Sequence, residues 1–282
     1  MERERARRLI EHLRAGVPSL EVAELLSQGR GRLMGEIEAD LAALAAGRPR
    51  PGRIVAGNYG DGKTHTLSAI QALASRQGFL VSVFTASRES PLDRPDRVYR
   101  KLLRRTYAPG VSRPGIELLL RRIGEKPELV QRLLRFCEQN LHPKLALVLE
   151  ASLEGEFGAS EELERDLAGY LLTAAEARRA YQTALGRRAP KIENFHSQHA
   201  LSYLRLLDEL STLAGYAGWV LLLDEIELLG RLGRLGRARS YALLGELWDQ
   251  KSFPHTYAVA AVAASFQTDL TDRLKDMERL PD

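Results

Sequence analysis

The chain has 282 residues, of which 44% are hydrophobic and 28% are charged. These proportions are typical of a globular protein and exclude a mainly disordered, a collagen-like or a disulfide-rich chain. The single cysteine, Cys137, can form no disulfide within the chain, and no apolar run reaches the roughly 18 residues of a spanning helix. The first residues, Met-Glu-Arg-Glu-Arg, lack the apolar core of a secretory signal, so we expect a cytoplasmic protein. A net charge of +4 allows nucleic-acid binding without implying it.

Residues 1–107 begin with helices and then change to alternating strands and helices. Apolar residues at helical spacing predict helices over 3–14 and 32–46, followed by a Gly/Pro-rich turn. The next segments predict strand 54–56, helix 64–77, strand 79–85 and helix 95–107. This alternation is typical of an α/β domain with a parallel sheet.

The middle of the chain differs from what precedes and follows it. Residues 108–195 show apolar spacing of three to four and predict four or five helices without a strand. Afterwards the pattern predicts helices 199–213 and 240–248 and the buried strands 219–223 and 257–264. We therefore expect four parts: a helical lead-in (1–47), a first core part (48–107), a helical insertion (108–195) and a second core part (196–282).

One motif carries specific chemistry. Residues 57–64, Gly-Asn-Tyr-Gly-Asp-Gly-Lys-Thr, fit G-x-x-x-x-G-K-[ST] in full, between an expected strand and an expected helix. Glycines let successive N–H groups face the phosphates of a nucleotide, and the following helix adds its positive end. Lys63 would reach the β- and γ-phosphates, and the Thr64 hydroxyl would bind Mg²⁺. The candidate ATP-binding residues are Gly57, Asn58, Tyr59, Gly60, Asp61, Gly62, Lys63, Thr64 and His65. For His65 the favoured interpretation is a structural role, with the edge of the nucleotide site as the alternative.

Two carboxylates follow the expected strand 219–223. The carboxyl end of a parallel strand faces the crevice where ligands bind, so Asp224 is expected to hold Mg²⁺ together with Thr64, usually through a water molecule. Glu225 would orient or deprotonate the attacking water. Glu227 is read as a solvated or structural carboxylate.

A polar residue also follows the expected last strand. Ser265 is the first candidate for contact with the γ-phosphate, ahead of Gln267 and Thr268, with a simple helix cap as the alternative. We count Ser265 with Glu225 and Lys63 as the candidate catalytic residues.

The pairing of G-N-Y-G-D-G-K-T-H with W-V-L-L-L-D-E-I-E-L-L resembles AAA+ ATPases of the origin-recognition type. More narrowly, the chain is similar to the P-loop ATP-binding proteins of BREX phage-defence systems over roughly residues 5–270. Further stretches support this: the lead-in ending Gln-Gly-Arg-Gly-Arg-Leu, Ser90-Pro91-Leu92, the helical insertion, and Leu213-Ala214-Gly215-Tyr216.

The resemblance implies an ATP-binding and ATP-hydrolysing component of a defence complex. It implies a homo-oligomer, or a complex with other defence proteins, in which a neighbour supplies an arginine; Arg273 or Arg279 would fill this role. The chain ends 17 residues after Ser265, so we expect no full carboxyl-terminal lid and slow turnover in isolation. Two alternatives stay open, an ATP-gated switch that binds DNA or protein without useful hydrolysis, and a small-molecule kinase. Basic clusters at 3–14 and 231–239 keep DNA open as a ligand.

Overall fold

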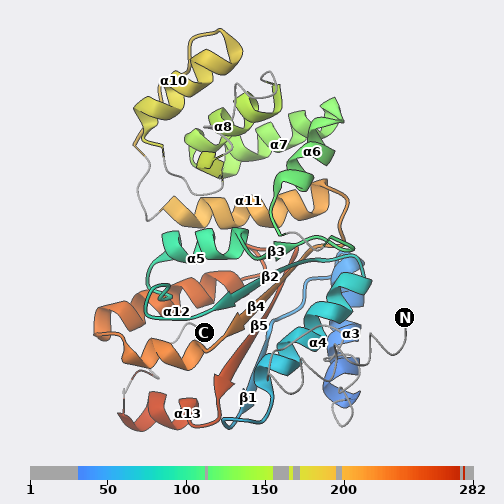
Figure 1. The fold of residues 1–282 in the computed structure, drawn as a ribbon, viewed down its shortest axis with the longest axis vertical. Coiled ribbons are helices and arrows are strands. Elements are labelled where there is room, and N and C mark those ends of the chain that lie inside the picture. Colours follow the sequence, from blue (N-terminus) through green and yellow to red (C-terminus); the bar gives the residue numbers. More distant parts are fainter. Residues whose placement is uncertain are drawn as a thin grey trace, which may run out of the picture.

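A five-stranded sheet forms the centre of the molecule (Figure 1). The structure is a computed structural model that describes residues 31–111, 114–154, 165–167, 172–194, 199–273 and 276. The predicted helix 3–14 lies outside these residues. The strands, in the spatial order β1-β5-β4-β2-β3, are β1 (Arg53–Gly57), β2 (Leu80–Thr85), β3 (Thr106–Tyr107), β4 (Trp219–Asp224) and β5 (Thr256–Ala263).

Four strands of the sheet are parallel, and β3 alone runs antiparallel to its neighbour β2. Every residue of the central strand β4 is buried, as its Trp-Val-Leu-Leu-Leu run predicts for a strand covered on both faces. The register pairs Thr85 of β2 with Asp224 of β4, and Gly57 of β1 with Ala263 of β5. The carboxyl ends of these strands therefore meet at one edge of the sheet, which confirms the predicted α/β fold with a mostly parallel sheet.

Helices cover both faces of the sheet (Figure 1). On one face, α3 (Gly31–Ala45) and α4 (Lys63–Arg76) pack Leu41 and Ile70 against Val220 and Val259. The side chains that point the opposite way along the same strands join a second core on the other face. That face is covered by α5 (Pro95–Leu103), α11 (Ala200–Leu213) and α12 (Arg234–Trp248).

Further helices stack beyond α11, away from the sheet (Figure 1). They are α6 (Glu117–Gly124), α7 (Pro127–Asn140), α8 (Pro143–Glu154) and α10 (Ala174–Leu185). The division of the chain into core and insertion remains a prediction. Among the described residues, no helix is both long enough and apolar enough to cross a bilayer.

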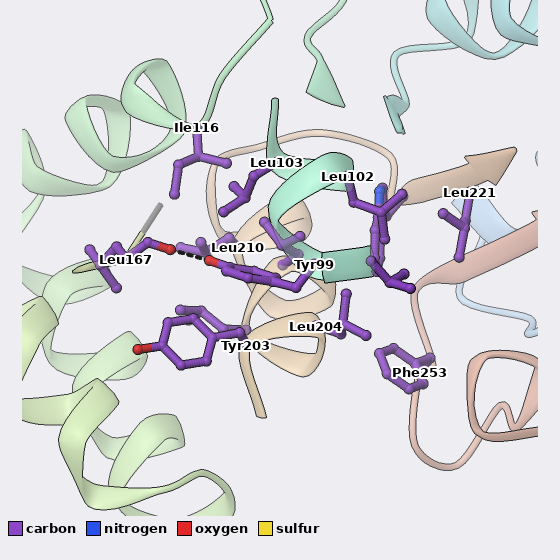
Figure 2. Close-up of a cluster of buried hydrophobic side chains, with 14 of the residues drawn as sticks. Tyr99, Leu102, Leu103, Ile116, Leu167, Tyr203, Leu204, Leu210, Leu221 and Phe253 are labelled. Carbon is purple, nitrogen blue, oxygen red and sulfur yellow. Dashed lines mark hydrogen bonds between the residues drawn. The ribbon is translucent and has the colours of Figure 1, made fainter. Parts of the chain in front are cut away.

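A buried polar network ties these outer helices to the core. Lys144 of α8 donates to Asp166 across 2.9 Å, and neither side chain is exposed. Tyr203 of α11 donates to the same carboxylate. Tyr99 of α5 donates to the carbonyl of Leu167 (Figure 2). Each of these buried polar groups has a partner, because an unpaired one would be costly.

The predicted helix 95–107 was wrong at its end, because α5 stops at Leu103 and Thr106 belongs to β3. A chain of buried hydrogen bonds explains the change. Trp219 donates from Nε1 to the Ser82 hydroxyl, which lies 2.6 Å from the Thr106 hydroxyl, and Thr106 donates to the carbonyl of Leu102. Thr106 is thus held against β2 by groups that are distant in the sequence.

Asp208 of α11 is a buried carboxyl group at the opposite edge of the sheet. It accepts hydrogen bonds from the Thr256 hydroxyl (2.6 Å) and the His255 backbone N–H (3.1 Å). Burial nevertheless raises its pKa from 3.8 to about 7. The folded protein therefore binds this proton more tightly than the unfolded chain does, and the stability linked to it is present below pH 4 and lost as the pH rises to about 7.

We predict that Asp208→Asn removes this pH dependence, since the amide oxygen still accepts from Thr256 and carries no charge. Between these two pKa values, the free energy of unfolding of the wild type falls by about 1.4 kcal/mol for each pH unit, which lowers its Tm by several degrees. In thermal melts, the Tm of the variant minus that of the wild type should increase from pH 5 to pH 8. The exposed Glu138→Gln serves as the control, and a Tm difference that is independent of pH for Asp208→Asn would contradict the account.

Candidate functional site

A glycine-rich loop, residues 57–62, joins the end of β1 to the start of α4. Gly60 and Gly62 have φ angles of 90° and 76°, in the left-handed region that residues with a Cβ avoid. A Cβ at Gly57 would come within 3.4 Å of the Asp61 and Lys63 side chains, so a larger residue there would have to push them aside by a few tenths of an ångström. These three glycines allow the chain to turn sharply just before the amino terminus of a helix.

Side chains of the loop and of α4 hold its shape. The Lys63 ammonium donates to the carbonyl oxygens of Gly57 and Asn58, each 3.1 Å away. The Asn58 backbone N–H donates to a carboxylate oxygen of Asp61 at 2.7 Å. Lys63 is half-buried beneath the loop, whereas Tyr59 at its tip is fully exposed. The sequence motif did not reveal this contact of Asp61, because the pattern leaves its position unspecified.

Thr64 and Asp224 meet although 160 residues separate them. The Thr64 hydroxyl donates to Asp224 Oδ2 across 2.7 Å. The other oxygen, Oδ1, accepts the backbone N–H of Glu225 at 2.9 Å. Asp224 is buried at the carboxyl end of β4, and Thr64 is exposed in the first turn of α4. The structure therefore places Lys63, Thr64 and Asp224 at the same edge of the sheet.

Glu225 has an unusual backbone conformation. Its φ of 59° is the one positive value among the described residues other than glycine. Such a conformation is strained for a long side chain and is often found at functional sites. Glu225 lies between β4 and the 3₁₀ helix η2 (Ile226–Arg231), so the turn fixes the direction in which its side chain leaves the sheet.

The electrostatic surroundings also set Glu225 apart. Burial raises its pKa above the usual value for glutamate, and the charges of Glu227 and Asp224 raise it further. Lys63 and Arg231 act in the opposite direction. Glu225 thus lies within electrostatic reach of the loop lysine and is a stronger base than an exposed glutamate.

Glu227 was expected to be a solvated or structural carboxylate, and its burial argues against the first of these two roles. It is half-buried, and its Oε2 is shielded from solvent without a hydrogen-bond partner in the described part of the chain. Its negative charge acts on Glu225 two residues earlier. The Asp-Glu-Ile-Glu spacing is the sequence signal for this pair, but the burial depends on the turn at Glu225.

The other predicted site residues lie in α4 and in the segment that follows β5. Ser265 is exposed two residues after β5, next to Ala264, whose N–H donates to the carbonyl of Gly57. Its side chain makes no capping hydrogen bond with α13 (Phe266–Thr268), so the alternative role as a helix cap is not observed. His65 is half-buried in α4, and Thr268 is exposed. The side chains of Gln267 and Arg273, and all of Arg279, lie outside the described residues.

A comparison with protein-family models decides the family. Residues 1–115 and 121–280 match the model described as BREX system ATP-binding protein BrxC/D. The chain belongs to this BREX ATP-binding family. The match includes the glycine-rich loop, Asp224, Glu225 and Ser265, so every candidate residue described above lies within the family region. No curated protein and no solved structure matches the chain.

Proposed function

We propose that this BREX-family protein binds ATP and Mg²⁺ at the glycine-rich loop and hydrolyses the bond to the γ-phosphate. The observation that carries the proposal is the 2.7 Å contact between Thr64 and Asp224, since it joins the two sequence motifs at one point. The family name supports ATP as the ligand. In this proposal the α/β core is a P-loop core of the AAA+ type.

Phosphate binding follows from the loop and the helix behind it. The first backbone N–H groups of α4 point out of the helix and lack partners within it, which favours an anion there. Lys63 now donates to two loop carbonyls and would exchange these weak acceptors for charged phosphate oxygens. Gly60 and Gly62 keep side chains away from the space in which the phosphates would lie.

The donors at this edge also fit Mg²⁺, which prefers hard oxygen ligands in octahedral geometry. Adjacent ligands of an octahedral ion at about 2.1 Å lie about 3 Å apart, close to the observed Thr64–Asp224 separation of 2.7 Å. Thr64 and Asp224 would hold the ion, which supplies charge neutralisation for the phosphates when it is bound. The remaining ligands would be water and phosphate oxygens, as is usual for Mg²⁺.

Glu225 is proposed to prepare the water for attack. The water oxygen forms a bond to the γ-phosphorus, the bond from that phosphorus to the bridging oxygen breaks, and the proton of the water passes to the carboxylate. A raised pKa suits this role, because a stronger base accepts the proton more readily. Ser265, beside the start of the loop, would contact the γ-phosphate.

We further propose that nucleotide state is coupled to conformation or assembly in a defence complex, in the cytoplasm. The strained turn at Glu225 leads directly into η2, and η2 leads into α12. Loss of the γ-phosphate would therefore alter a turn that only one short helix separates from α12. An arginine from a neighbouring copy would raise turnover by about 10³–10⁵. We therefore expect the isolated chain to hydrolyse ATP slowly.

Release of phosphate from ATP by the purified protein tests the proposal. Slow, Mg²⁺-dependent release, absent from Lys63→Ala, is expected. Tight ATP binding without release would instead favour the ATP-gated switch, and transfer of phosphate to a metabolite would favour a small-molecule kinase.

Glu227 gives a more specific prediction. Glu227→Gln removes a negative charge near Glu225 and should lower the pKa of Glu225, because the ionised form is no longer repelled. Turnover falls on the acid side as Glu225 is protonated, so this limb of the pH–rate profile should move to lower pH in the variant while ATP binding is kept. Phosphate release measured across pH 4–8 checks the shift. An unchanged acid limb would show that Glu227 does not act on the catalytic base.

A further inference from the structure

The end of η2 and the first turns of α12 carry a strongly basic surface. Arg231, Arg234 and Arg239 are all exposed, and within the described part of the chain none of them forms an ion pair or a hydrogen bond through its side chain. The neighbouring Leu235 is 75% exposed. We call these three arginines together with Leu235 the basic surface.

The basic surface has no acidic residue within its own stretch of sequence, although the Asp93 carboxylate lies beside Gly236 of α12. No aspartate or glutamate occurs between Glu227 and Glu246. A fourth arginine, Arg237, behaves differently: it pairs with the buried Asp276 and donates to the carbonyl of Leu232. Arg237 therefore anchors the start of α12, while the three other arginines remain available to a ligand.

We propose that the basic surface binds the phosphodiester backbone of a nucleic acid. Guanidinium groups match phosphate oxygens in pairs, and this short segment exposes three of them. The buried centre of a protein–protein interface is mostly apolar, whereas this surface offers a single large apolar side chain among three arginines. Charge is thus its dominant property.

The basic surface lies next to the candidate active site. Arg231 ends η2, six residues after Glu225. Nucleic acid held at Arg231 would therefore lie close to the proposed hydrolysis site and should change the rate of ATP turnover. This consequence rests on the proposed function, but the binding itself does not.

The test measures binding of labelled duplex DNA, single-stranded DNA and RNA by fluorescence anisotropy at several salt concentrations. Three phosphate contacts contribute about −2.7 to the slope of log K against log salt, equivalent to about a fortyfold loss of affinity between 50 and 200 mM. Arg231→Ala/Arg234→Ala/Arg239→Ala should make the slope shallower by this amount. The triple Arg→Lys variant should retain most of it, because the charges remain.

The control is Arg132→Ala/Arg179→Ala/Arg188→Ala, which removes three exposed arginines from α7, α10 and the segment after α10 and changes the net charge equally. The control should bind as the wild type does, and thermal melts should show that both triple variants are folded. Binding should also persist in Lys63→Ala, so that failure of the ATP site is separable from failure of the basic surface.

Three outcomes would overturn the proposal. The first two are equal binding by the wild type and the Arg231/Arg234/Arg239 variant, and an equal loss in the control. The third is binding of an acidic polypeptide, such as polyglutamate, in the absence of any binding to nucleic acid at low salt, which would assign the surface to an acidic protein partner.

Discussion

Lys63→Ala is expected to abolish tight ATP binding. The Lys63 ammonium is the one positive side chain of the motif 57–64, and in the structure it lies directly beneath the loop, 3.1 Å from two of its carbonyls. Loss of two charge-assisted hydrogen bonds at about 1.5–3 kcal/mol each corresponds to a decrease in affinity of about 100-fold or more. Calorimetric titration with ATP and Mg²⁺ measures the effect directly.

The control for this prediction is Lys191→Ala, which removes an exposed lysine outside the site. Because Lys63 also braces the loop, a thermal melt should accompany each titration. An affinity within a few fold of the wild type in a folded Lys63→Ala protein would show that the nucleotide binds elsewhere.

Glu225→Gln is expected to keep ATP binding and to slow hydrolysis. The amide has the size of the carboxylate and can occupy the same left-handed turn, but it cannot accept the proton of the attacking water. Loss of a general base typically lowers the rate by about 10²–10⁴. Single-turnover phosphate release, together with calorimetry, separates the effect on chemistry from the effect on binding.

Glu138→Gln, an exposed change on α7, serves as the matched control. Glu225→Gln with wild-type turnover would remove Glu225 from the mechanism. Loss of binding in a folded Glu225→Gln protein would instead point to a structural role for this turn.

Local patterns were sufficient to predict much of the fold. The apolar run 219–223 is buried on both faces, and such a run has few alternatives to a central strand. The meeting of Thr64 with Asp224 also follows from simple reasoning, since the carboxyl ends of the parallel strands share one edge of the sheet. Motif spacing and strand direction together therefore located the candidate site.

Other features depend on contacts that no local pattern encodes. The two-residue strand β3 exists because Thr106 joins the buried hydrogen-bond chain from Trp219 through Ser82. Helix α12 begins at Arg234 rather than at the predicted Ser240, since the glycines at 233 and 236 weaken its helical pattern. The left-handed turn of Glu225 is likewise imposed by the surrounding structure, as glutamate has no preference for it.

A crystal structure of Glu225→Gln grown with ATP and Mg²⁺ tests the central claim most directly. The account predicts a triphosphate seated on the backbone of residues 57–64, Lys63 turned from the loop carbonyls to the phosphates, and a metal ion between Thr64 and Asp224. A triphosphate bound away from this loop, or a metal ion that contacts neither Thr64 nor Asp224, would contradict it.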